Sequence, residues 1–374
     1  MRLAVHREIP DDEALAHQWN ELVMQMERPE VFYTYEWALA MSRAYGASMT
    51  PLLILAYEHS RLVGVVSLAT SDTRSGTFFL GSTTADYCDF VSAPQRRLDL
   101  VDVVFDELRK LKIQALVFSN LPADSATIHA LPLAARIHGH ATFSRPAFQC
   151  ANVSLAFEAD RSRVKESVTN RKAFRYGLKK LGEHGPVRVD HLQTHESLAC
   201  GLTEFMQAHI DRFAATGRTS NLAQPQRQVF LSELSALLCK LGWMALSRLL
   251  VADIPVAWNY GFQFAGSWFY YQPTFDRRWQ QFSPGFCLLS KIVEAACDNP
   301  AIQLVDLGLG AEGYKQRFAT RVRQTVDISA TTSTIRHVKE SMRYRAVSAV
   351  KSSPRLEHCV RRLLGRTVAG ELGA

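Results

Sequence analysis

Hydrophobic positions in the first half of the chain follow two periods, one typical of helices and one typical of strands. Over residues 11–26 apolar side chains recur at helical spacing, and two aspartates stand where an N-cap is preferred. A second helix is expected at 35–45. Residues 52–57 and 62–70 are rich in β-formers and flank a polar turn, which predicts an antiparallel hairpin. The other elements expected for this α+β lobe are strands at 77–80, 115–119 and 149–155 and helices from 94 to 110 and from 124.

The second half of the chain repeats this plan. A basic segment at 160–184 has helical spacing and is ended by Gly185-Pro186. Three expected strands at 244–252, 256–264 and 268–273 predict a second meander, and a helix is expected after it at 284–298. The remaining expected elements are strands at 187–191, 302–307 and 322–331, helices at 197–215 and 225–241, and a short helix near Tyr314. The repeat is one of topology, without convincing similarity between the residues of the two halves.

Length and composition agree with two packed lobes. A chain of 374 residues is about right for two hydrophobic cores, and 47% hydrophobic with 21% charged residues is typical of a globular protein. We therefore expect lobes at residues 1–157 and 158–332 and a basic helical tail at 333–374. No apolar run approaches the ~20 residues of a membrane helix. Charges interrupt the first residues before a signal peptide could form, so we expect a cytoplasmic protein.

The metal-ligating residue types form no known motif. Seven cysteines include no CxxC pair, and the histidines include no HExxH, so we expect reduced thiols and no metal. The net charge of +7 favours an anionic ligand or surface. Charge alone leaves nucleic acid, a phosphorylated cofactor and anionic lipid open.

The first candidate site joins the second meander to the helix that follows it. Ser283 stands at a predicted N-cap, Pro284 at the first helical position, and Gly285 lets a ligand approach the first turn. Free amides and the helix dipole make such a start an anion site. Arg277 and Arg278 would add charge-assisted hydrogen bonds to phosphate. The alternative is a plain capped helix after a basic turn.

The second candidate site is the glycine-containing loop after the strand at 302–307. Residues 308–313 match GxGxxG, but a dinucleotide-binding fold would place this strand first and several βα units after it. The loop instead carries Asp306, Glu312, Tyr314 and Lys315 toward a cleft. Acyl transfer needs a base and an acid, which a carboxylate and a phenol can supply. For each residue alone, a hydrogen bond that fixes the loop is an equal alternative.

Two basic segments remain. The helix around residues 170–180 carries Arg171 and Lys172 and would suit a phosphate-rich substrate or RNA, although such helices usually present a solvated face. The arginine-rich tail from Ser333 also favours a solvated face, with a partner or a membrane surface left open.

The order of these motifs resembles the CelD-type acetyltransferases of bacterial polysaccharide synthesis, relatives of the FemAB-like tandem GNAT proteins. The resemblance spans roughly residues 33–331. The segments that carry it are 170–181, 209–218, 270–276, 283–285, 306–308 and 314–315. It implies two GNAT-like lobes with mixed, mainly antiparallel sheets, and acyl-CoA between the strands that end near Asp276 and at Asp306. Only Gly285 of the usual Gly-x-Gly phosphate loop is present, so an activated acyl donor other than CoA remains an alternative.

The resemblance implies transfer of an acyl, in the first instance acetyl, group from acyl-CoA to an amine or hydroxyl of a sugar or related envelope precursor. The candidate catalytic residues are Asp306, Glu312 and Tyr314. The candidate donor-binding residues are Arg277, Arg278, Ser283, Gly285 and Phe286, and the candidate acceptor-binding residues are Arg171, Lys172, Tyr270, Asp276 and Lys315. One alternative is FemAB-like aminoacyl transfer from charged tRNA. Another is a non-catalytic scaffold that meets envelope-synthesis partners through the basic tail.

Overall fold

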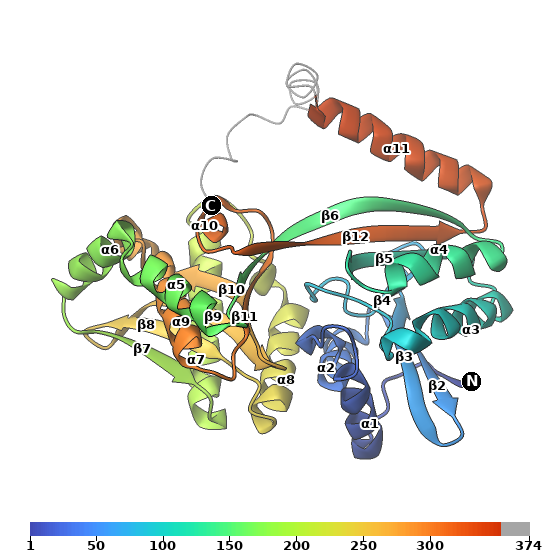
Figure 1. Ribbon diagram of the computed structural model, residues 1–374, viewed down its shortest axis with the longest axis horizontal. Helices are drawn as coiled ribbons and strands as arrows, with labels where there is room; N and C mark the ends of the chain where they lie inside the picture. The colour runs from blue at the N-terminus through green and yellow to red at the C-terminus, as the bar shows by residue number, and fades with distance from the viewer. Residues whose placement is uncertain (353–374) are drawn as a thin grey trace.

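The computed structural model describes residues 1–352, in which helices pack against one long mixed sheet (Figure 1). The first half contains β1 (Arg2–His6), α1 (Glu13–Val23), η1 (Val31–Tyr33), α2 (Tyr35–Tyr45), β2 (Thr50–Glu58), β3 (Arg61–Thr70), β4 (Thr77–Phe79), η2 (Pro94–Arg96), α3 (Arg97–Lys110), β5 (Ala115–Pro122), α4 (Thr127–Ile137) and β6 (Ala141–Ser154).

The second half continues with α5 (Glu158–Thr169), α6 (Lys172–Gly182), β7 (Val187–Leu192), α7 (His195–Ala214), η3 (Asn221–Ala223), α8 (Pro225–Lys240), β8 (Leu246–Val251), β9 (Ile254–Phe264), β10 (Ser267–Phe275), η4 (Arg277–Phe282), α9 (Pro284–Asp298), β11 (Leu304–Leu309), α10 (Gly313–Gln316), β12 (Arg321–Thr331) and α11 (Thr334–Ser352). The two meanders β1–β4 and β7–β10 confirm the expected α+β class.

The two lobes are joined through the centre of the sheet. Its strand order is β1-β2-β3-β4-β5-β12-β6-β11-β10-β9-β8-β7. Strand β6 pairs with β12 along most of its length and with β11 near its end, and β12 pairs on its other side with β5. Figure 1 shows β6 and β12 running together across both lobes. The boundary expected at residue 157 therefore does not divide the sheet, because β12 lies against the first lobe.

A hydrophobic core also crosses between the lobes. The indole of Trp37 on α2 packs edge to face on Phe230 of α8 and Phe262 of β9, at centroid distances of 5.4 Å and 5.6 Å. Phe32 contacts Trp37 and Phe269 in the same way. Aromatic pairs of this geometry stabilise beyond the area that they bury. A second core lies between the sheet and α5, α6 and α9.

Local sequence signals account for most element boundaries. Asp12 caps α1 by accepting from the amides of Ala14 and Leu15 at 2.8 Å and 3.1 Å, and the predicted helix at 35–45 is α2. The basic helix expected at 160–184 is broken at Asn170 and Arg171 into α5 and α6, which pack separately on α9.

The basic tail begins as a helix. Residues 334–352 form α11, which lies beside β6 and β12 (Figure 1). The rest of the predicted tail, residues 353–374, lies outside the described residues. Over residues 1–352, no helix combines the length and the apolar character required to cross a membrane.

A buried arginine of α5 binds the carbonyl groups at the C-terminal end of α9. Arg161 of α5 is 8% exposed, and its guanidinium donates to carbonyl oxygens at the end of this helix and in the following turn. Those acceptors belong to Ala296, Cys297, Asn299, Pro300 and Ile302. A cation at this position satisfies carbonyls that have no partner within the helix and also complements the helix dipole.

We predict that Arg161→Ala lowers the free energy of unfolding by about 3 kcal/mol, because buried carbonyls lose their donor. Arg163 is the matched control on the same helix: its side chain is 71% exposed and pairs only with Asp160. Arg163→Ala should cost less than about 0.5 kcal/mol. Equal urea denaturation curves for the two variants would contradict the assigned role of Arg161.

Candidate functional site

Strands β10 and β11 pair in parallel over a short stretch and then separate. Their register joins Ser267–Phe269 to Leu304–Asp306. Beyond this point β10 is irregular against β9, and β11 turns at Gly308, whose φ is +72°, toward Cys150 of β6. The opening between the two strands therefore begins immediately after Asp306. This is where the sequence placed the acyl donor.

The start of α9 offers free backbone donors. Its first intrahelical hydrogen bond runs from the Cys287 amide to the Ser283 carbonyl at 3.1 Å, and no side chain caps the helix. The amides of Gly285 and Phe286 therefore precede the helical ladder, as the anion-site hypothesis requires. Ser283 is exposed and takes a left-handed conformation with φ of 53°, so its hydroxyl does not serve as the expected cap.

An arginine distant in sequence lies beside this helix start. The guanidinium of Arg171 stacks over Phe286 and over Phe318, at 5.9 Å and 4.8 Å from the ring centroids. Its Nη2 donates to the Arg317 carbonyl at 2.7 Å, whereas its buried Nη1 has no partner. A buried donor without an acceptor is costly. Arg171 is thus held beside α9 with one donor available for a ligand.

The arginines expected to serve this role are engaged elsewhere. Arg277 donates to the Ala215 carbonyl at the end of α7. Arg278 is 82% exposed and forms an ion pair with Asp276 at 2.5 Å. Asp276 also caps η4 through the amide of Arg278. These contacts give the three residues structural roles, and they favour Arg171 over Arg277 and Arg278 as the cation next to the α9 start.

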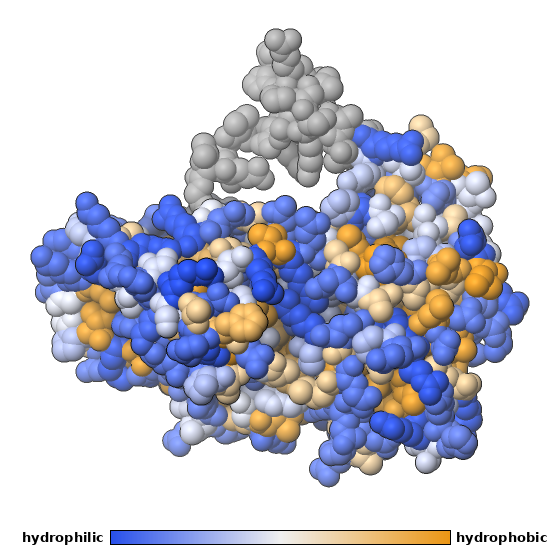
Figure 2. Space-filling view, viewed as in Figure 1, coloured by the Kyte–Doolittle hydropathy of each residue, from blue (hydrophilic) through white to orange (hydrophobic). Residues whose placement is uncertain are grey.

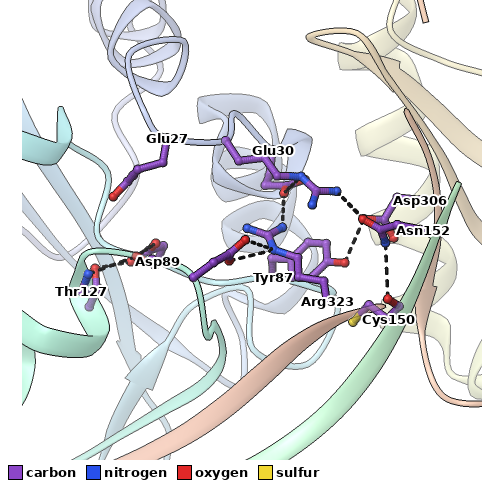
Figure 3. Close-up of polar contacts among 12 residues, drawn as sticks. Glu27, Glu30, Tyr87, Asp89, Thr127, Cys150, Asn152, Asp306 and Arg323 are labelled. Atoms are coloured by element: carbon purple, nitrogen blue, oxygen red, sulfur yellow. Dashed lines mark hydrogen bonds and ion pairs between the residues drawn. The ribbon is translucent and has the colours of Figure 1, made fainter. Parts of the chain in front are cut away.

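The carboxylate of Asp306 is the centre of a buried network (Figure 3). It is 1% exposed and accepts from the Tyr87 hydroxyl at 2.8 Å, Arg28 Nη2 at 2.9 Å and the Gly308 amide at 2.9 Å. Arg28 also donates to Asn152 Oδ1 at 3.0 Å. These three donors hold the carboxylate in a fixed position, which favours a positioning role for Asp306 over the expected role as a base.

A second ion pair lies next to this network. Glu30 is fully buried and pairs with Arg28 at 3.1 Å and with Arg323 of β12 at 2.5 Å. Arg323 also reaches Asp124 at 2.9 Å. Burial raises the pKa of Glu30 to about 7, although both arginines oppose the shift. The ion pair of Glu30 with Arg323 joins the loop after α1 to β12 in the centre of the sheet.

The loop after β11 contains two side chains that fix its conformation and one phenol that remains available for chemistry. Lys315 is 5% exposed and donates to the Leu309 carbonyl at 2.6 Å, and it pairs with Glu312 at 2.9 Å. These contacts fix the loop, which was the alternative role considered for both residues. Burial, and then the charge of Glu312, raise the pKa of the Tyr314 phenol. That phenol stays protonated at neutral pH and remains a candidate acid.

The other two sequence candidates lie in contrasting surroundings. Tyr270 is 2% exposed, and burial raises its pKa well above the ordinary value. Its phenol is electrostatically coupled to Tyr314 and Arg212, which places it near the α10 loop. Lys172 is exposed at the start of α6 and has no described partner in the site.

A cleft of about 440 Å³ lies between the two lobes beside the β10–β11 opening. Both lobes contribute polar side chains to it. Its polar lining includes Thr84, Asp86, Asn120, Asn221, Arg227, Tyr271, Gln272 and Asp327. Among the side chains of residues 1–345, no three His, Cys, Asp or Glu residues gather as metal ligands.

Asp86 places a carboxyl group where the cleft meets the strand opening. Its Oδ2 would lie 2.7 Å from a Cβ at position 308, so Gly308 is required for this approach. Burial, and then the neighbouring Asp306 carboxylate, raise the pKa of Asp86 to about 7. A carboxyl group with this pKa can accept and return a proton near neutrality.

Arg227 supplies an unsatisfied cation to the same cleft. It is 5% exposed, and its Nη2 donates to the Tyr271 hydroxyl at 2.7 Å. Its Nε and Nη1 are buried and have no partner. Tyr271 in turn donates to the Thr84 carbonyl, which holds it between the lobes.

Sequence reasoning missed Asp86 and Arg227. Each stands in ordinary local sequence, Asp86 in the loop after β4 and Arg227 in the first turn of α8. Neither belongs to a motif, because their proximity arises from the packing of two lobes. The loop that contains Asp86 also contains Thr83, Thr84 and Asp89, so no local signal distinguished Asp86.

Comparison with known proteins agrees with this architecture. Residues 169–316 match the acetyltransferase (GNAT) domain family. The crystal structure of FemX has a TM-score of 0.61 at 11% identity, over 88% of this chain and 97% of that one. The structure of L-PGS from Bacillus licheniformis has a TM-score of 0.55 at 10% identity, over 97% of this chain and 99% of that one.

A third similar structure is the C-terminal domain (DUF2156) of a putative lysylphosphatidylglycerol synthetase from Agrobacterium fabrum. Its TM-score is 0.53 at 11% identity, over 88% of this chain and 95% of that one. No curated protein sequence matches the chain. Identities this low establish the fold alone. The chain therefore has a GNAT-like α+β fold, and the family match is to its residues 169–316.

Proposed function

We propose that this protein is a GNAT-type acyltransferase that moves an acyl group, acetyl in the first instance, from acyl-CoA to an amine or hydroxyl acceptor. The observation that carries the proposal is the uncapped start of α9, with the free donor of Arg171 beside it and the β10–β11 opening next to it. The GNAT domain match supports the same class. The CelD-like motif order supports a sugar or related envelope precursor as the acceptor.

The pyrophosphate of CoA fits the α9 start. The amides of Gly285 and Phe286 and the positive end of the helix dipole would bind two phosphate oxygens. Arg171 Nη1 would add a charge-assisted hydrogen bond. The acyl end of the donor would then extend along the opening between β10 and β11 toward Gly308.

The chemistry requires one proton acceptor and one proton donor. We assign the base to Asp86, which would remove the proton as the acceptor's amine or hydroxyl attacks the thioester carbonyl. The leaving CoA thiolate must be protonated, and the Tyr314 phenol is the candidate acid. Asp306 acts indirectly, since its hydrogen bond to Tyr87 holds the neighbouring Asp86 in place.

We predict that the protein binds acetyl-CoA with micromolar affinity and that Arg171→Ala weakens binding about tenfold or more, because a charge-assisted hydrogen bond is lost. Arg278→Ala is the matched control: it removes one positive charge from an exposed arginine that is paired with Asp276. It should leave the affinity nearly unchanged. Isothermal titration with acetyl-CoA and with longer acyl-CoAs measures both.

The outcome that would reject the CoA hypothesis is an absence of heat with every acyl-CoA tested. The competing donor is an aminoacyl-tRNA, for which the exposed cations Lys172 and Arg175 of α6 would be the contact surface. Salt-dependent tRNA binding that is lost on Lys172→Glu/Arg175→Glu, without acyl-CoA binding, would support that alternative.

We predict that kcat/KM falls about tenfold for each pH unit below about 7, because a protonated Asp86 cannot act as a base. Asp86→Asn should lower the rate about 100-fold or more and remove this inflection. Release of the CoA thiol measures the rate. Glu30→Gln is the control, since burial also raises the pKa of Glu30 to about 7 but its carboxylate is held between Arg28 and Arg323, outside the cleft lining. The assignment fails if Glu30→Gln, rather than Asp86→Asn, abolishes the inflection.

The acceptor should carry an anionic group. Arg227 lines the cleft with two buried donors that have no protein partner, and a phosphate or carboxylate would satisfy both. Asp86 lies in the same cleft, so an anion on Arg227 would place the acceptor near the base. A phosphorylated sugar precursor meets this requirement.

We predict that UDP-N-acetylglucosamine binds in the presence of saturating CoA and that Arg227→Gln weakens this binding about tenfold or more. Neutral N-acetylglucosamine should bind far more weakly. Isothermal titration measures both ligands, and unchanged acetyl-CoA affinity verifies that the variant is folded. Equal binding of the neutral and charged sugars, or an unaffected Arg227→Gln variant, would contradict the anionic acceptor.

A further inference from the structure

The helix α11 exposes apolar side chains on the side that faces away from the protein. Ile335, Val338 and Met342 are 83%, 47% and 65% exposed. Their spacing of three and four residues places them on one face of the helix. Figure 2 shows hydrophobic residues among hydrophilic ones over this helix. A surface helix normally turns such a stripe toward the core.

The opposite face of α11 contacts the protein through polar and aromatic groups. Arg336 donates to the Ser75 hydroxyl at 3.2 Å and pairs with Glu340 at 3.1 Å. The ring of Tyr344 packs on Phe143 of β6 at a centroid distance of 5.5 Å. These contacts fix the orientation of the helix, so the apolar stripe is held outward.

Cations border the outward stripe. Lys339 follows it on one side and Arg345 on the other at 100° per residue, and both are exposed. Arg343 lies further round the helix and lines the groove beneath it. The acidic residue among positions 334–345, Glu340, lies on the inner face and is paired with Arg336. The outward face therefore combines an apolar centre with positive flanks and no negative charge.

This charge pattern determines which kind of partner can bind the outward face of α11. A second copy of the helix would bring cations against cations, which is unfavourable. The segment 353–374 is itself arginine-rich, with Arg355, Arg361, Arg362 and Arg366, and would meet the same repulsion. An anionic lipid surface accepts apolar side chains at its boundary and attracts the flanking cations.

We propose that α11 lies on the surface of an anionic membrane and docks the protein there. The apolar stripe enters the headgroup and acyl-chain boundary, and Lys339 and Arg345 contact anionic headgroups. The groove beneath the helix and the inter-lobe cleft share Asp327 as a lining residue. A docked helix would therefore hold the cleft close to the membrane surface.

Vesicle co-sedimentation of the full chain tests this docking. The protein should sediment with phosphatidylcholine vesicles that contain phosphatidylglycerol and not with pure phosphatidylcholine, and added salt should release it. Lys339→Glu/Arg345→Glu and Ile335→Gln/Val338→Gln/Met342→Gln should each weaken binding about tenfold or more.

The matched control replaces exposed apolar residues on another helix. Leu133 and Ile137 of α4 are 46% and 72% exposed, and Leu133→Gln/Ile137→Gln should leave vesicle binding unchanged. Acetyl-CoA titration and thermal unfolding verify that each variant is folded. The docking model is rejected if anionic vesicles fail to sediment the protein or if the two α11 variants bind as the parent does. A concentration-dependent dimer abolished by the apolar variant would assign the stripe to a second copy instead.

Discussion

The arrangement of the site depends on the ion pair and hydrogen bond that the buried Asp306 carboxylate forms with the first lobe. A charge removed from water costs several kcal/mol unless it is paired, so Arg28 and Tyr87 of the first lobe must lie against the second. Asp86 directly precedes Tyr87. The hydrogen bond from the Tyr87 hydroxyl to Asp306 therefore also fixes the position of Asp86 beside Gly308. The candidate base thus comes from one lobe and the donor site from the other. The antiparallel pair of β6 and β12 makes this junction part of one continuous sheet.

The cation beside the donor helix illustrates the difference between sequence proximity and spatial proximity. Arg277 and Arg278 lie in η4, directly before α9 in the chain, but their side chains bind elsewhere. Arg277 donates to the Ala215 carbonyl at the end of α7, and Arg278 pairs with its own neighbour Asp276. Arg171, more than a hundred residues earlier, reaches the site because α6 packs on α9 and stacks its guanidinium on Phe286.

The sequence predicted what depends on local periodicity and little that depends on long-range packing. The α2 helix, strands β2 to β4, the second meander and the α9 start follow from hydrophobic spacing, caps and Pro284, and all were predictable, whereas β1 was not expected. The insertion of β12 between β5 and β6 was not predictable, because the hydrophobic pattern of a strand does not specify which strand it pairs with. Asp86 and Arg227 were missed for the same reason: a loop acid and a helix arginine have no distinguishing periodicity until two lobes bring them into one cleft.

The topological repeat does not produce two equivalent sites. In the first lobe the helix after β4 is α3, and its first residue, Arg97, is 1% exposed and paired with Asp89 at 3.1 Å and Glu27 at 3.2 Å. Ser125 and Thr127 complete its hydrogen bonds. The Arg97 guanidinium is therefore committed to partners within the first lobe, and the cost of breaking the ion pairs of a buried arginine keeps it from a second donor. The first lobe instead contributes Asp86 and one wall of the cleft, which explains why a doubled fold supports a single candidate centre.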